Sequence, residues 1–162
     1  MLKAIAGFVA GILVTAIAGY LMMPSLMFTE RVSPYGMEET IARIQHNIQD
    51  SPELKAKGWS LSGLRNPAKA VQGDGGNVLP VMMIEACSTK YSKPILKDDT
   101  VRFLSILMPC KVSVYKKEDG KVYIGVESGW FYKLDPFRTE AWGKYRKPVI
   151  EAERLLLGTT AD

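Results

Sequence analysis

The sequence contains few of the residues that most often build catalytic and metal-binding sites. Among its 162 residues are one histidine, His46, and two cysteines, Cys87 and Cys110. A blue-copper site needs two histidines, and covalent haem attachment needs a Cys-x-x-Cys-His motif, and the sequence has neither. We therefore expect no catalytic residue, no metal and no cofactor, with non-covalent haem on His46 or a methionine as the remaining alternative.

Phosphate-binding and nucleic-acid-binding patterns are missing as well. The glycine-rich stretch QGDGGN at 72–77 lacks the wider glycine spacing and the following Lys-Ser/Thr of a phosphate-binding loop. The chain has 21 Lys and Arg against 17 Asp and Glu, and its lysines are scattered rather than clustered. A nucleic-acid surface needs a basic patch on one face, so we expect no nucleic-acid partner.

An uncharged apolar run, residues 4–28, is the most prominent feature that the sequence does contain. As a helix with ~1.5 Å rise per residue, Ala4 to Met23 is long enough to cross a ~30 Å hydrocarbon core. The length of this run predicts a transmembrane anchor over residues 1–28.

A cleaved signal peptide is the alternative interpretation of this run. Lys3 and the Ala16-Ile17-Ala18 triplet before Gly19 could supply a basic start and a cleavage site. The apolar run continues past that site to Phe28, which favours an uncleaved anchor. Lys3 lies before the run, whereas Glu30 and Arg31 cancel after it, which predicts a single-pass protein of the inner membrane with its C-terminal domain in the periplasm.

Small residues recur every four positions within the run, at Gly7, Gly11, Thr15 and Gly19. Such a stripe lets two helices approach closely, so it predicts packing against other membrane-protein subunits. The alternative is that glycine is simply common in membrane helices.

The rest of the chain predicts a linker over 29–36 and a compact two-layer α+β domain over 37–162. Met37, Ile41, Ile44 and Ile48 form one apolar helical stripe. The other expected elements are a strand at 59–64, a loop at 66–77, a strand at 78–86, a helix at 88–106, an antiparallel hairpin turning at Asp119-Gly120, and a helix at 142–157.

Residues 37–126 resemble the family known as domain of unknown function 302. The resemblance lies in ETIARIQHNI, in VMMIEACSTKYSKPIL with Cys87 closing a strand, and in LMPCKVSVYKKEDGKVYI, where Pro109-Cys110 opens the hairpin. The QGDGGN stretch is an insertion relative to the family pattern. The resemblance implies a compact α+β fold, often in exported or membrane-linked proteins, and it implies no established activity.

Cys87 and Cys110 are the best functional candidates, since each lies at the boundary of an expected strand. If the two strands are neighbours, the sulfurs come within disulfide reach. Three alternatives are open for this pair: a structural disulfide, two buried unbonded thiols, or a redox or sulfur-carrying dithiol. Lys90 and the start of a helix just after Cys87 favour some thiol reactivity.

The remaining candidates have ordinary structural interpretations. His46 lies off the apolar stripe of its helix, so we expect it to be exposed. Ser113-Val-Tyr-Lys116 matches a Ser-x-x-Lys motif, but on a strand the lysine does not lie over the serine. Trp130, Phe131, Tyr132 and Phe137 form either an aromatic cover on the core or a contact surface for a partner.

The glycine stripe and the lack of catalytic residues lead to our first functional hypothesis, which is a non-catalytic accessory subunit of a larger membrane complex. We expect that complex to be respiratory or to transfer electrons. The alternative is a membrane-tethered thiol/disulfide or sulfur-handling protein that uses Cys87 and Cys110.

Overall fold

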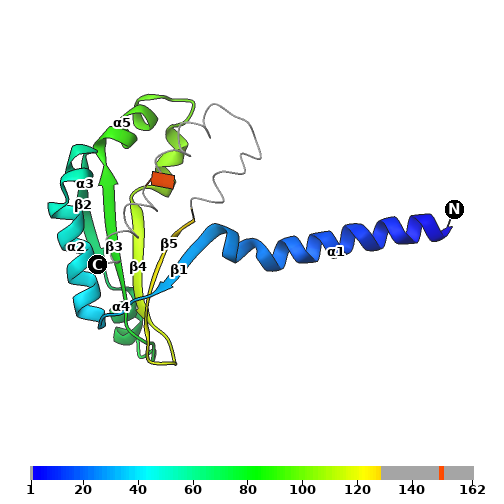
Figure 1. Ribbon diagram of the computed structural model, residues 1–162, viewed down its shortest axis with the longest axis horizontal. Helices are drawn as coiled ribbons and strands as arrows, with labels where there is room; N and C mark the ends of the chain where they lie inside the picture. Colours follow the sequence, from blue (N-terminus) through cyan, green and yellow to red (C-terminus); the bar gives the residue numbers. More distant parts are fainter. Residues whose placement is uncertain (1, 129–149, 152–162) are drawn as a thin grey trace.

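The computed structural model describes residues 2–128 and 150–151, in which helices and strands alternate along the chain (Figure 1). The elements are α1 (Leu2–Met27), β1 (Phe28–Val32), α2 (Met37–Asp50), α3 (Pro52–Ala56), β2 (Trp59–Arg65), α4 (Pro67–Gly73), β3 (Val81–Ser88), α5 (Thr89–Lys97), the 3₁₀ helix η1 (Arg102–Leu107), β4 (Cys110–Lys116) and β5 (Val122–Glu127).

The strands form one five-stranded antiparallel sheet in the order β1-β5-β4-β3-β2. The hairpin predicted around Asp119-Gly120 is confirmed as β4 and β5. Gly120 has a φ of 76°, a conformation that glycine adopts without the steric cost other residues meet. The α+β class predicted for the domain is also confirmed.

Helices α2 and α3 cover one face of the sheet, and the main core lies between them and the strands (Figure 1). The apolar stripe predicted for α2 is confirmed, because Ile44 and Ile48 are fully buried there. They pack with strand residues that alternate toward the same face, namely Ile84, Val112, Val114, Ile124 and Val126. A smaller cluster of Ile95, Val101 and Leu104 lies under α5 and η1.

Three local predictions differ from the structure. The expected linker at 29–36 instead begins with β1, which pairs along its whole length with β5. The expected loop at 66–77 contains α4, because the Asn66 side chain accepts a hydrogen bond from Lys69 N at 2.8 Å and Pro67 starts the helix. The helix expected at 88–106 divides into α5 and η1.

The predicted transmembrane anchor over residues 1–28 is wrong. Helix α1 covers Leu2–Met27, but no helix in the described part of the chain is both long enough and apolar enough to span a bilayer. The prediction relied on the length of the uncharged run. A span needs sustained apolar character along a helix as well as length. The single-pass placement in the inner membrane and the periplasmic orientation depended on that anchor and are wrong with it.

Two predictions concern the C-terminal part of the chain. The helix expected at 142–157 falls mostly outside the described residues, of which Ile150 and Glu151 are helical. Trp130, Phe131, Tyr132 and Phe137 lie outside the described residues altogether.

Candidate functional site

The antiparallel pairing of β3 and β4 brings Cys87 and Cys110 together. Cys87 is the second-to-last residue of β3, and Cys110 is the first residue of β4. In the ladder Ala86 lies opposite Cys110, so Cys87 is one position away from the direct partner. The two strands are therefore neighbours, as the disulfide hypothesis required, and both cysteines are free thiols in the structure.

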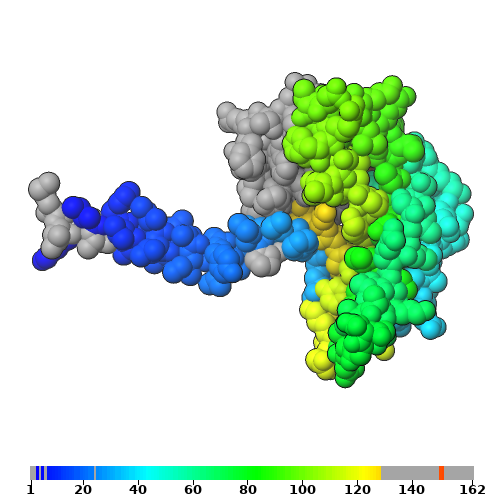
Figure 2. All heavy atoms as spheres, turned by 180° about the vertical axis from the view of Figure 1, so that it is seen from behind, coloured from blue at the N-terminus to red at the C-terminus, as the bar shows by residue number. Residues whose placement is uncertain are grey.

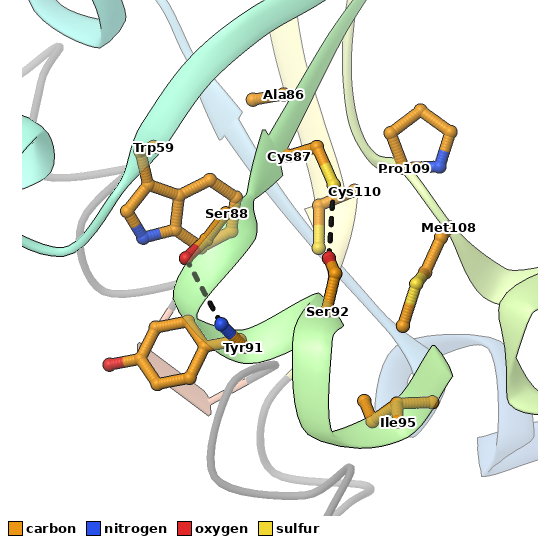
Figure 3. Close-up of a pocket in the computed structure, with 10 residues that line it drawn as sticks. All are labelled: Trp59, Ala86, Cys87, Ser88, Tyr91, Ser92, Ile95, Met108, Pro109 and Cys110. Carbon is orange, nitrogen blue, oxygen red and sulfur yellow. Dashed lines mark hydrogen bonds between the residues drawn. The ribbon is translucent and has the colours of Figure 1, made fainter. Parts of the chain in front are cut away.

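Both cysteines line one small pocket at the end of the sheet (Figure 3). Its volume is about 30 Å³, which is room for about two water molecules. The guest must therefore be a single ion or the end of a small molecule. The wall consists of Trp59, Ala86, Cys87, Ser88, Tyr91, Ser92, Ile95, Met108, Pro109 and Cys110.

Helix α5 closes the pocket because Ser88 fixes the point where the helix begins. The Ser88 Oγ accepts a hydrogen bond from Tyr91 N at 3.4 Å and donates one to the Lys57 carbonyl at 2.6 Å. The Tyr91 ring lies against Trp59, with 6.3 Å between the ring centroids. This cap holds the first turn of α5, and with it Ser92, over the two thiols.

The two thiols have different surroundings. Cys87 Sγ lies 3.1 Å from the Ser92 hydroxyl oxygen, and either group can donate the hydrogen bond. Burial raises the pKa of Cys110 to about 12, with further increases from the negative charge of Glu127 and from Cys87, while Lys111 acts in the opposite direction. Cys110 is therefore protonated at neutral pH.

The pocket suits sulfur chemistry better than the metal chemistry of harder ligands. Within residues 2–128 and 150–151, no three His, Cys, Asp or Glu side chains converge on one point. A structural zinc site needs four such ligands, and this pocket offers two. The polar and sulfur groups of its wall are two thiols, one thioether and the hydroxyls of Ser88, Tyr91 and Ser92.

The other sequence candidates lie elsewhere. His46 lies on α2 and is exposed, as predicted. Its Nδ1 is 2.9 Å from Asp50 Oδ2. Ser113 and Lys116 are on β4, where the structure confirms a strand. Gly7, Gly11, Thr15 and Gly19 are on α1, which projects from the sheet in both overall views (Figures 1 and 2).

Sequence reasoning missed Ser92, Tyr91 and Met108 as pocket residues. Met108 precedes Pro109 and Cys110, and a cis peptide bond joins Met108 to Pro109. Its position two residues before Cys110 was the one sequence feature that could have indicated a place in the pocket. Ser92 and Tyr91 gave no signal, because their place depends on how α5 folds back over the strand ends.

A second polar cluster, also missed, lies on β1, β4 and β5. Glu30 accepts hydrogen bonds from Tyr115 and, at 2.6 Å, from Lys117. The Tyr115 and Tyr123 rings stack with centroids 6.0 Å apart, and Lys117 Nζ lies 4.1 Å from the centre of the Tyr123 ring. This cluster attaches the edge strand β1 to the hairpin and is exposed, so we assign it a structural role.

The comparisons with known proteins agree with this fold. Residues 29–128 match the family described as domain of unknown function DUF302. The crystal structure of an uncharacterized conserved DUF302 protein from Bacillus stearothermophilus is similar, with a TM-score of 0.63 and 20% sequence identity over 83% of this chain and 96% of that one. No curated protein matches the chain. At that identity the structural match supports the fold alone, whereas the family match covers well over half of the sequence, and the chain therefore belongs to the DUF302 family.

Proposed function

We propose that the protein exchanges thiols and disulfides through Cys87 and Cys110. The observation that carries this proposal is that two free thiols from neighbouring strands line one pocket of about 30 Å³. Disulfide exchange needs one thiol to attack and a second thiol within reach to displace the product.

Cys87 is the attacking thiol in this proposal. Cys110 is held protonated by burial, which raises its pKa to about 12, and a protonated thiol is a poor nucleophile. Cys87 has the Ser92 hydroxyl at 3.1 Å, which limits the rotation of its side chain. Ser92 acts as a positioning residue.

The exchange balances in two steps. The Cys87 thiolate attacks one sulfur of a small-molecule disulfide, the substrate S–S bond breaks, and one substrate thiolate leaves and takes up a proton. The Cys110 thiol then loses its proton and attacks Cys87 Sγ, which forms the Cys87–Cys110 disulfide and releases the second substrate thiol. The substrate disulfide gains two electrons and the protein dithiol loses two.

The experiment is to treat the reduced full-length chain with glutathione disulfide and to follow the products by intact mass spectrometry. We expect an internal disulfide in the wild type, a trapped mixed disulfide in Cys110→Ser, and no adduct in Cys87→Ser at neutral pH. Ser92→Ala should slow the first step, and Ser113→Ala, a serine on β4 outside the pocket, should not. A wild type in which both thiols remain open to alkylation after treatment would refute the proposal.

An accessory role through α1 is the second candidate, and the exposed apolar surface of that helix favours it. Phe8, Val14, Tyr20 and Leu21 are each at least 66% exposed. A shallow groove along the helix is lined by Gly7, Phe8, Gly11, Ile12, Thr15 and Ala16. Small residues in such a groove let a second helix approach closely. Under this proposal α1 joins the domain to a larger assembly, such as the electron-transfer complex expected from the sequence.

The glycines of α1 provide the test. A Cβ added at Gly7 or Gly11 meets no other atom within 4 Å, so both positions face open space in the described structure. We expect Gly7→Leu with Gly11→Leu to remove the chain from any larger complex in native extracts, measured by size and by crosslinking. Ala10→Leu, outside the groove, is the matched control and should leave the complex intact. A wild-type chain that is only a free monomer would contradict the accessory role.

A further inference from the structure

A third sulfur lies in the pocket beside the two thiols. The Met108 side chain forms the wall across from Trp59, and the two cysteine sulfurs lie between them (Figure 3). Met108 comes from the segment between η1 and β4, so three separate places in the sequence supply the sulfurs. Disulfide exchange has no use for a thioether, and the proposed function leaves Met108 unexplained.

We propose that Cys87, Cys110 and Met108 together bind one Cu(I) ion. Thiolate and thioether sulfur are soft ligands, and soft ligands select Cu(I) among the biological transition metals. Carboxylate and imidazole groups, which favour zinc and the harder cations, are not among the pocket residues.

The size and polarity of the pocket agree with a single soft ion. About 30 Å³ is room for one ion and leaves no room for a bulky chelate. Trp59, Ile95 and Pro109 supply apolar wall, so the ion would be shielded from water. The hydroxyl of Ser92 is already in contact with Cys87 and can hold that ligand in place after the thiol proton is lost.

The binding step needs no electron transfer. Cu(I) enters as Cu(I), the two thiols release two protons, and the bound unit carries one net negative charge. Lys111 on β4 lies close enough to act electrostatically on Cys110, and its positive charge partly offsets the negative charge of the bound unit. The negative charge of Glu127 on β5 acts in the opposite direction. The inference requires reduced thiols and does not depend on disulfide exchange. An internal disulfide would remove two of the three ligands.

The test is an anaerobic titration of the reduced full-length chain with Cu(I), in competition with a chromogenic Cu(I) chelator. We expect one ion per chain, and loss of this binding in Cys87→Ser and in Cys110→Ser. Met108→Leu conserves side-chain volume and should weaken the affinity about tenfold, which corresponds to ~1.4 kcal/mol. Met83→Leu, a methionine of β3 outside the pocket, is the matched control and should leave the affinity unchanged.

Several outcomes separate this inference from the proposed function. Unchanged Cu(I) affinity in Met108→Leu would overturn the three-sulfur site, and so would tighter binding of Zn(II) than of Cu(I). X-ray absorption of the loaded protein should show a shell of sulfur ligands, and a shell of nitrogen or oxygen would also overturn it. Failure of exchange with intact Cu(I) binding would refute the proposed function alone.

Discussion

At the scale of single residues, the two cysteines of the pocket have different surroundings, and burial shifts the pKa of Cys110 upward. Cys110 begins β4 and packs against the main core, where burial disfavours its thiolate. Cys87 faces Ser92 at the start of α5. The proposed exchange relies on this difference when it gives Cys87 the attacking role and Cys110 the second.

Thiol alkylation should reveal the asymmetry directly. With a pKa of about 12, Cys110 is ionised to about one part in 10⁴ at pH 8, so we expect Cys87 to be alkylated first. The alkylation rate of Cys110 should rise about tenfold per pH unit above pH 8, as measured by mass spectrometry on the Cys87→Ser variant. A rate for Cys110 that levels off near pH 9 would show an ordinary thiol.

The raised pKa of Cys110 also affects the stability of the fold at high pH. The folded state keeps the Cys110 thiol neutral, so its contribution is fully present below the ordinary thiol pKa of about 9 and is lost as the pH rises toward 12. Chemical denaturation from pH 8 to 11 should show a smaller loss of unfolding free energy for Cys110→Ser than for the wild type. Equal losses in the two proteins would contradict the burial of this thiol.

At the scale of elements, the first turn of α5 determines the shape of the pocket. Ser88 caps the helix and also bonds to the Lys57 carbonyl, while Tyr91 packs on Trp59. The pocket therefore depends on a cap that lies one residue after Cys87.

We expect Ser88→Ala to lower the unfolding free energy by about 1 kcal/mol, because an N-cap bond and a buried hydrogen bond are lost. It should also speed alkylation of Cys110, since α5 would open more often. Ser60→Ala, on the exposed side of β2, is the control and should change neither quantity. Denaturation curves and alkylation rates measure the two effects, and an unchanged Cys110 rate would mean that α5 does not shield the pocket.

The edge strand β1 is also held in place partly by a few side chains, those of Glu30, Tyr115 and Lys117. Hydrogen bonds from Lys117 and Tyr115 lower the pKa of Glu30, so its contribution is present above pH ~4.5 and is lost as the pH falls through the lowered value. Glu30→Gln should cost less than about 1 kcal/mol at pH 7, because the ion pair is exposed, and should cost less still at pH 3. Denaturation at the two pH values measures this, and a cost that grows on acidification would contradict the assignment.

At the scale of the whole molecule, the sheet and the two helices on it form one buried core, and α1 lies outside that core (Figure 2). Ile84→Ala, at a fully buried position of the central strands, should lower the unfolding free energy by about 2–5 kcal/mol. Ile106→Ala, at a position that is 82% exposed on η1, is the control and should cost little. Similar costs for the two variants would mean that the core lies elsewhere.

Local patterns in the sequence determined much of the fold. The stripe from Met37 to Ile48, the apolar run of β3 and the Asp119-Gly120 turn each contain their own periodicity or turn chemistry, and each element is present. The family resemblance came from the same segments. The length of the N-terminal run, by contrast, did not establish a membrane span, because a span needs sustained apolar character as well as length.

Tertiary structure decided the sheet order and the site. The pairing of β1 with β5 joins segments at opposite ends of the domain, and no local pattern encodes such a contact. The sequence by itself determined that Cys87 lies at the end of one strand and Cys110 at the start of another. Only the antiparallel pairing of β3 with β4, and the return of α5 over their ends, placed those thiols beside Ser92 and Met108, because a pocket arises from contacts between elements rather than from the periodicity within one.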